Sequence, residues 1–196
     1  MDIDNVGKIA ELFNRRYKLP EDTKHLLVEK NYTDTHEEFE SCAELILYNQ
    51  DVEYLTCRFE DQDGDNNMPE LFPYFGQVKN LCKNCDYIIF ACVDGIFYIL
   101  LVELKLFNPS NKPKEQLRIS KTFVEFLIKR FAAIGYEFIE EPKVRLIGIR
   151  DTQRHRIPKK QYTKPRDYIY DQDGYFELRD GVKGRHIMVR LDSLLK

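Results

Sequence analysis

The sequence has no long apolar run. Its longest, from Ile96 to Val102, is far shorter than the roughly 20 residues that a helix needs to cross a bilayer. The first residues, MDIDNVGK, also lack the charged and apolar regions of a signal peptide. We therefore expect a soluble, cytoplasmic protein that has no membrane partner.

The pattern of the cysteines does not suit a disulfide framework. An odd number of cysteines, five in 196 residues, fits a protein of a reducing compartment. Cys82 and Cys85 have the spacing of half a zinc site, but no second pair follows to supply the other two ligands. An interaction domain that binds zinc through this pair remains an alternative that the sequence does not favour.

The chain also lacks internal repeats and any obvious linker. Its 196 residues are enough for one domain with a proper core. We expect a single domain over residues 1–196, in which a helical extension (1–34) precedes the core (36–150) and a basic loop with β-structure (151–196) follows it.

The segment from Asp86 to Lys105 predicts a β-hairpin. Asp94-Gly95 stands between two runs of β-branched and aromatic residues, and both residues of this turn tolerate a positive φ. With Asp94 and Gly95 as the two loop residues, Asp86 lies directly opposite Glu103. Lys105 follows two residues later and therefore shares the face of Glu103. Opposed residues have Cβ atoms roughly 5 Å apart, so two carboxylates there need a cation between them, which a divalent metal can supply.

An acid before one strand, Glu-x-Lys at the end of the next strand and a helix that carries Gln116 together resemble the PD-(D/E)XK nuclease superfamily. Acid-x-lysine triplets occur three times in the chain, so the apolar strand, the hairpin partner and the following helix distinguish the triplet Glu103–Lys105. Cys85 stands where the motif usually has proline. The resemblance covers roughly residues 36–150. It implies the restriction-endonuclease-like α/β (α+β) fold, with helices on both sides of a mixed central sheet of four to five strands.

The same resemblance implies a catalytic site for metal-assisted phosphodiester hydrolysis. Asp86 and Glu103 would bind Mg²⁺, with Mn²⁺ as a substitute and the carbonyl of Leu104 as a further ligand. Lys105 would orient or help to deprotonate the attacking water and would stabilise the pentacovalent state. Gln116, in the first turn of its helix, would help to order the site.

Hydrophobic spacing and helix caps predict the remaining elements. Thr35 and Glu38 form a capping box, so a helix should run from about residue 36 to 49. In the nuclease superfamily a helix in this place often supplies a further acid to the metal site, and here either Glu38 or Glu40 could do so. Other helices are expected over residues 3–14, 20–27 and 114–133, and strands over residues 52–58, 144–150, 168–170, 175–178 and 186–191. The last three strands would form a C-terminal β-hairpin elaboration.

Positive charge is concentrated near the carboxyl end of the chain. Residues 1–142 contain 26 acids and 16 bases, whereas residues 143–196 contain 7 acids and 14 bases. Nine bases and one acid occur between Lys143 and Arg166, which is typical of a surface that faces phosphates. We expect the nucleic-acid-binding residues there to include Arg150, Arg154, Arg156, Lys159, Lys160, Lys164 and Arg166.

These features predict a Mg²⁺-dependent endonuclease that cuts DNA, with RNA as the less favoured substrate. The resemblance is consistent with a role in restriction or phage defence. Cutting both strands of a duplex usually requires two active sites, which favours a homodimer. The alternative is a non-catalytic module that keeps the nuclease-like fold to bind nucleic acid or protein, although such a module has no need of buried charges.

Overall fold

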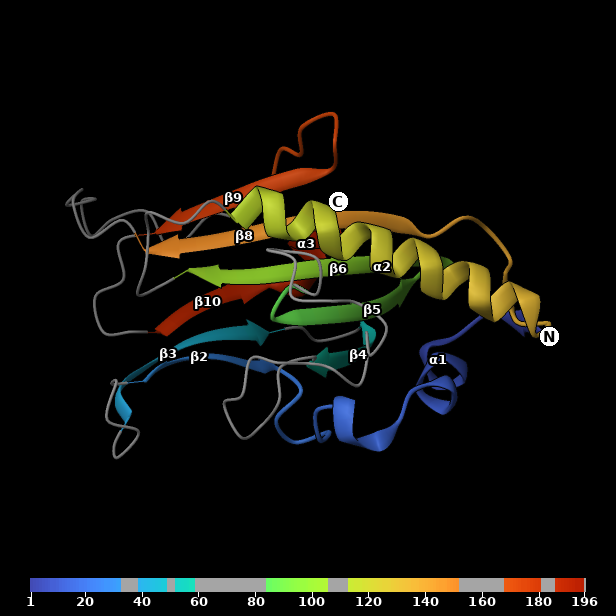
Figure 1. Cartoon of the computed structure of the whole chain (residues 1–196), viewed down its shortest axis with the longest axis horizontal. Helices are drawn as coiled ribbons and strands as arrows, with labels where there is room; N and C mark the ends of the chain where they lie inside the picture. The colour runs from blue at the N-terminus through green and yellow to red at the C-terminus, as the bar shows by residue number, and fades with distance from the viewer. Residues whose placement is uncertain are drawn as a thin grey trace, which may run out of the picture.

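Three layers of secondary structure make up the protein (Figure 1). The central layer is a five-stranded sheet, which has helices α1 (Val6–Leu12) and α2 (Pro113–Ala133) on one face and a three-stranded sheet on the other. Apolar side chains between the layers form two core clusters, one on each face of the central sheet. The computed structural model describes residues 1–32, 39–48, 52–58, 84–105, 113–151, 168–180 and 186–195.

The central sheet is mixed, with the strand order β4-β5-β6-β8-β9. Its first three strands are antiparallel, and its last three are parallel. The predicted mixed α/β class and the sheet of four to five strands are therefore confirmed. The five strands are β4 (Glu53–Arg58), β5 (Tyr87–Val93), β6 (Ile96–Lys105), β8 (Lys143–Asp151) and β9 (Tyr175–Asp180).

The hairpin of β5 and β6 has the predicted turn and register. Asp94 and Gly95 have φ angles of 52° and 78°, which are the positive values that this two-residue turn requires. The ladder pairs Val93 with Ile96 at the turn and Tyr87 with Val102 at its far end. One step beyond that last pair, the same register brings Asp86 opposite Glu103.

The helical layer covers the face of the central sheet on which Glu103 and Lys105 lie. Helix α2 follows β6 in the chain and leads to β8, which lies parallel to β6 as predicted. Leu117 and Val124 of α2 belong to the same buried cluster as Ile99 of β6. The predicted helices over residues 114–133 and 3–14 are confirmed, although the second is shorter than expected and has Asn5 as its N-cap.

A second sheet, rather than helices, covers the opposite face of the central sheet. The expectation of helices on both sides is therefore wrong in part, because among the described residues only the short helix α3 (Leu191–Leu195) joins the sheet there. The hydroxyl of Tyr87 connects the two sheets, since it donates to the carbonyl of Val28 (3.0 Å) and accepts from its amide (2.9 Å). The strand order is β10-β3-β2, with β2 (Leu26–Tyr32), β3 (Phe39–Tyr48) and β10 (His186–Arg190).

Two predicted helices are wrong: within residues 20–27 a turn covers residues 21–25 and β2 begins at Leu26, and the described part of residues 36–49 forms β3. The prediction of a helix over residues 36–49 was based on apolar residues at helical spacing and on a capping box. Both residues of that box, Thr35 and Glu38, lie outside the described residues. In β3, Leu45 and Leu47 are buried while Tyr48 is exposed, which is the period of a strand. Pairing with β2 on one side and β10 on the other overrides the local helical preference.

The predicted C-terminal hairpin is also wrong. Strand β9 pairs in parallel with β8 of the central sheet, whereas β10 pairs in parallel with β3 of the second sheet. Residues 168–170 are not a strand, and a turn precedes β9, with the amide of Gly174 donating to the carbonyl of Asp171 (2.9 Å). Each strand therefore completes a different sheet, which local sequence spacing does not reveal.

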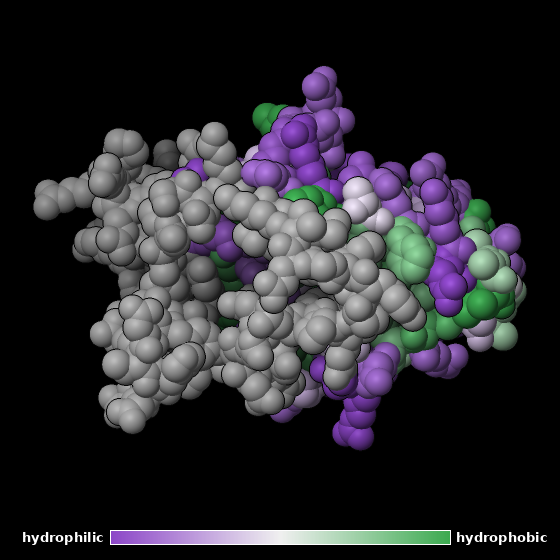
Figure 2. Space-filling model, viewed as in Figure 1, coloured by the Kyte–Doolittle hydropathy of each residue, from purple (hydrophilic) through white to green (hydrophobic). Residues whose placement is uncertain are grey.

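Small elements complete the described part of the chain. Strands β1 (Asp2–Ile3) and β7 (Glu137–Phe138) pair in parallel, and a short 3₁₀ helix covers Arg15–Tyr17. Hydrophilic side chains and smaller apolar areas share the surface on the side of α2 (Figure 2). Among the helices of the described ranges, none is long and apolar enough to cross a membrane.

Candidate functional site

Three of the predicted site residues lie on one face of the central sheet. The alternate residues that precede Glu103 on β6 belong to the helix-side core cluster, so Glu103 and Lys105 continue that face. The same alternation along β5 assigns Asp86 to it. The structure therefore brings Asp86, Glu103 and Lys105 together where β6 ends and α2 begins, as the sequence predicts.

The two acids are buried and held by defined contacts. Glu103 has no exposed surface and Asp86 is 9% exposed. Oδ2 of Asp86 accepts a hydrogen bond of 2.6 Å from the backbone amide of Leu104. Lys105 forms an ion pair with Oε1 of Glu103, and its side chain is 17% exposed. Burying charges is costly unless they are paired, so these contacts account for how the acids are accommodated.

The first turns of α2 hold the chain segment that leads into Asp86. The side-chain amide of Gln116 donates to the carbonyl of Asn84 (2.7 Å). One turn later, the hydroxyl of Ser120 accepts from the amide of Cys85 (2.6 Å) and donates to the carbonyl of Gln116 (3.0 Å). Gln116 thus orders the approach to β5, which is a structural counterpart of its expected ordering role.

Cys85, the residue before Asp86, is buried close to both carboxylates of the site. Burial raises the pKa of the Cys85 thiol, and the nearby charges of Glu103 and Asp86 raise it further. The thiol therefore stays protonated at neutral pH and packs as a small apolar group beneath α2. Cys82, its partner in the candidate zinc pair, lies outside the described residues.

Gly148 and Glu177, which the sequence analysis did not single out, extend the site across the central sheet to β8 and β9. The register pairs Glu103 with Gly148 of β8, and Gly148 with Glu177 of β9. A Cβ atom on Gly148 would lie 2.8 Å from Cγ of Pro113 and 2.9 Å from the hydroxyl of Tyr175. Glycine at this position therefore allows the start of α2 and the Tyr175 ring to pack closely against β8.

Glu177 is held by two neighbours in this part of the site. The hydroxyl of Tyr175 donates to its Oε2 (2.7 Å), and Nη1 of Arg150 donates to its Oε1 (3.2 Å). The predicted strand over residues 175–178 places Tyr175 and Glu177 on one face, which is a usable sequence signal. The parallel pairing of β9 with β8 was the missing information, because it alone brings this pair to Arg150.

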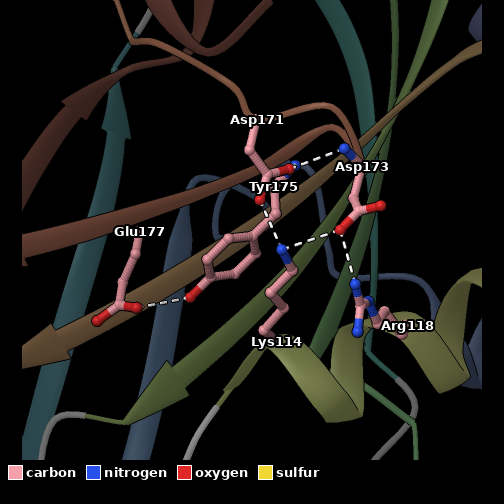
Figure 3. A network of polar contacts seen from close by, with 6 residues as sticks. All are labelled: Lys114, Arg118, Asp171, Asp173, Tyr175 and Glu177. Atoms are coloured by element: carbon pink, nitrogen blue, oxygen red, sulfur yellow. Dashed lines mark hydrogen bonds and ion pairs between the residues drawn. The ribbon is translucent and has the colours of Figure 1, made fainter.

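A polar network fastens the turn before β9 to the start of α2 (Figure 3). The ammonium of Lys114 lies 2.6 Å from Oδ2 of Asp171 and 2.9 Å from Oδ2 of Asp173, and Arg118 lies 2.7 Å from the latter oxygen. Hydrogen bonds from Lys114 lower the pKa of both carboxyl groups, with Arg118 adding to the effect at Asp173. The same bonds raise the pKa of Lys114. Oδ1 of Asp171 also accepts from the backbone amide of Tyr175 (3.0 Å), which joins the network to the residue whose hydroxyl binds Glu177.

Apart from Arg150, the remaining predicted site residues are not brought to this site by the described part of the structure. Glu38 lies outside the described residues, and Glu40 lies in β3, so the helix that was expected to carry them is absent at Glu40. Whether either acid joins the metal site stays a prediction. Of the predicted nucleic-acid-binding residues, Arg150 is the one in the described ranges, and the others lie outside them: Arg154, Arg156, Lys159, Lys160, Lys164 and Arg166.

The donor set at the end of β6 fits a hard divalent cation. Asp86 and Glu103 are two buried carboxylates on one face, and Mg²⁺ usually takes one or two carboxylates from a protein while it keeps several waters. Elsewhere in the described ranges, as at this site, no three His, Cys, Asp or Glu side chains are grouped to hold a metal ion. Asp86 and Glu103 are therefore the residues that would hold Mg²⁺, with further oxygen ligands from the Leu104 carbonyl and solvent.

The protein has a mixed α/β fold. At one end of its central sheet, the buried acids Asp86 and Glu103 lie near two basic side chains, Lys105 and Arg150. Comparisons with protein-family models, with curated proteins and with solved structures found no match for this chain.

Proposed function

We propose that the protein is a metal-dependent nuclease with a restriction-endonuclease-like core, which hydrolyses phosphodiester bonds in DNA. One observation carries this proposal: the buried acids Asp86 and Glu103 share one sheet face with Lys105, beside the start of a helix. Buried ionic groups are costly to a fold, so their convergence at one point favours a chemical role over a structural one.

The order of the elements around the site supports the same proposal. An antiparallel strand pair is followed by a helix and by a strand that lies parallel to the second member of the pair. This is the order in which the PD-(D/E)XK resemblance expects the acid, the Glu-x-Lys triplet and the glutamine. The second sheet, with β2, β3 and β10, is a departure that this resemblance does not account for.

Each residue of the site has a distinct role in the proposed reaction. Asp86 and Glu103 would hold Mg²⁺, and the hydrogen bond from the Leu104 amide fixes the orientation of the Asp86 carboxylate. When bound, the ion supplies Lewis-acid chemistry that activates water and neutralises charge on the phosphate. Lys105, which its ion pair with Glu103 keeps at the site, orients the attacking water and, as an ammonium, stabilises the negative charge of the pentacovalent phosphate.

The positive charge near the carboxyl end of the chain supports a nucleic acid as the substrate. The bases between residues 143 and 166 supply affinity for phosphates that does not depend on base sequence. DNA is favoured over RNA because it is the usual substrate of the resembling superfamily. Restriction or phage defence is the biological setting that this resemblance favours, and a homodimer would supply the two sites that cutting a duplex requires.

Cleavage assays with matched variants test the proposal. Purified protein is incubated with plasmid, linear duplex, single-stranded DNA and RNA, in the presence of Mg²⁺, Mn²⁺ or EDTA. We expect metal-dependent cutting that Asp86→Ala, Glu103→Ala and Lys105→Ala each remove. Glu53→Gln is the matched control, because Glu53 is an exposed acid of the same sheet. Binding of nucleic acid without cutting by the wild type would instead support the non-catalytic module.

A further inference from the structure

Arg150 is the cation that lies next to Lys105 in the central sheet. The parallel register of β6 and β8 pairs these two residues directly, and neighbouring strands lie about 4.8 Å apart. The alternation of β8 assigns Arg150 to the α2 face, which is the face of Lys105. Lys105 and Arg150 are therefore neighbours across the two strands. They lie two residues beyond the neighbouring pair Glu103 and Gly148.

Each of these two cations has its own carboxylate partner. Lys105 pairs with Glu103, and Arg150 pairs with Glu177 across an Nη1–Oε1 distance of 3.2 Å. Gly148 separates the two acids, because the register places it between Glu103 and Glu177. The result is two parallel acid–base pairs on the two sides of a residue that has no side chain.

The guanidinium of Arg150 is partly dehydrated and held in place. Its side chain is 21% exposed and that of Glu177 is 15% exposed, so this is not an ion pair of the open surface. The Tyr175 hydroxyl binds the other oxygen of Glu177 at 2.7 Å, which limits rotation of the carboxylate that Arg150 contacts. The Nε atom of Arg150 is buried and makes no hydrogen bond to any residue that the structure describes.

This arrangement differs from what a purely structural ion pair needs. A structural pair stabilises best when the donors of the guanidinium are all satisfied, whereas here Nη1 is fixed by Glu177 and Nε has no hydrogen bond to any described residue. A guanidinium binds two phosphate oxygens at once, and fixed donors act most strongly where negative charge develops in the transition state.

We infer that Arg150 is a second phosphate-binding cation of the active site, which contacts the scissile phosphate beside Lys105, and that Glu177 and Tyr175 are its positioning residues. This inference rests on the nuclease function proposed above and assigns Arg150 a place at the reacting phosphate. Glu177 orients the guanidinium through their ion pair, and Tyr175 orients Glu177. Gly148 contributes by leaving room for the Tyr175 hydroxyl.

The test combines binding without turnover and cleavage with turnover. Binding of a labelled DNA duplex is measured in EDTA at several salt concentrations, and kcat and KM are measured in Mg²⁺. The variants are Arg150→Gln, Arg150→Lys and Glu177→Gln. Arg190→Gln is the matched control, because Arg190 is also ion-paired with a carboxylate, Asp192, but lies on β10 of the other sheet.

We expect Arg150→Gln to lower kcat about 100-fold, the usual effect of removing one donor that faces developing charge. It should also reduce the slope of log affinity against log salt by about 0.9, which corresponds to one lost phosphate contact. Arg150→Lys should keep the slope but lower kcat about tenfold, because an ammonium cannot bind two oxygens in a fixed fork. Glu177→Gln should lower kcat while leaving the salt slope unchanged, and Arg190→Gln should leave kcat unchanged.

The outcomes separate this inference from the proposed function. If the wild type cuts DNA and Arg150→Gln keeps both kcat and the salt slope, the inference is overturned and the nuclease proposal stands. If the wild type binds but cuts no substrate with any metal, the nuclease proposal fails and the role of Arg150 fails with it. Should Arg150→Gln not fold, Arg150→Lys decides, since an unchanged kcat in that variant overturns the inference.

Discussion

Asp86 is joined to the strand opposite it by a hydrogen bond of 2.6 Å from the backbone amide of Leu104. This bond lies beside Glu103, the acid that the hairpin register places across from Asp86. The carboxylate of one strand is thus held by the backbone of the next, and the two acids keep a defined relation to each other. Five predictions follow from this geometry and its surroundings.

Asp86→Asn should remove cleavage while the protein stays folded. The asparagine oxygen can still accept from Leu104, but it brings no negative charge to a metal ion. We expect a rate loss of about a hundredfold or more in Mg²⁺. Asp86→Ala should in addition lower the free energy of unfolding by about 1–3 kcal/mol, because the Leu104 amide loses its acceptor. Cleavage rates and urea unfolding measure the two effects, and full activity in Asp86→Asn would exclude Asp86 from the chemistry.

Mg²⁺ should raise the melting temperature of the wild type. A ligand that binds the native state alone stabilises it by mass action, by about 2.7 kcal/mol at a hundredfold excess over Kd. The shift should be much smaller in Asp86→Asn, because one of the two carboxylates has lost its charge. Differential scanning calorimetry with Mg²⁺ and with EDTA measures it, with Glu53→Gln as the control for a general loss of negative charge. Equal shifts in Asp86→Asn and the wild type would contradict the metal assignment.

Lys105→Met should destabilise the protein, because it leaves the buried Glu103 carboxylate without its ion-pair partner. Removing one member of a buried pair typically costs about 3–5 kcal/mol. The double variant Lys105→Met/Glu103→Gln should regain much of that loss, because the uncompensated charge is gone. Urea unfolding of the two single variants and the double variant gives the coupling energy. Equal stability of Lys105→Met and the wild type would mean that other contacts of Glu103 offset the free-energy cost of burying its charge.

Gly148→Ala should lower stability by about 1–3 kcal/mol, the usual range for overpacking. The new Cβ would meet the Pro113 ring at 2.8 Å and the Tyr175 hydroxyl at 2.9 Å, so the start of α2 or the Tyr175 ring must move. Tyr175→Phe in the same chain removes one of these contacts and should restore part of the stability. Thermal melts of the single and double variants test this, and an unchanged melt for Gly148→Ala would show that the site adapts without cost.

The network of Lys114 with Asp171 and Asp173 should make stability depend on acid pH. Their pKa values lie below the ordinary 3.8 when the protein is folded, because Lys114 bonds to both. A lowered pKa in the folded state adds stability above the unfolded pKa and loses it as pH falls through the folded value. The difference in melting temperature between the wild type and Lys114→Met should thus be constant between about pH 5 and 7 and should shrink as the pH falls below 3.8, through the lowered pKa values of the folded state. A difference that persists in acid would point to packing of Lys114 on Tyr175 instead of charge.

Local chemistry made much of the site predictable. Asp94 and Gly95 specify a two-residue turn, the turn specifies the register, and the period of two then places Asp86, Glu103 and Lys105 on one face. Gln116 was expected to help order the site because the resemblance to the nuclease superfamily implies a glutamine in the first turn of the next helix. None of these steps needs information from distant parts of the chain, which is why the sequence predicts them correctly.

The contribution of β9 could not be found in this way. Tyr175 and Glu177 form an unremarkable pair on a short strand until that strand aligns with β8 and meets Arg150. The alignment depends on long-range pairing and on the contacts of the preceding turn with α2. The same reason explains the two segments that were expected to be helices, since β3 is defined by partners at both of its edges.

The sequence by itself determined the hairpin, its turn and register, the long helix behind it and the convergence of two acids and a lysine. These follow from residues close in the chain, whose turn preference and side-chain period act before any tertiary contact forms. Only the tertiary structure decided that a second sheet covers the other face, and that Arg150 and Glu177 lie beside the acidic pair. Those features depend on which strand edges meet, and strands carry too little local preference to specify a distant partner.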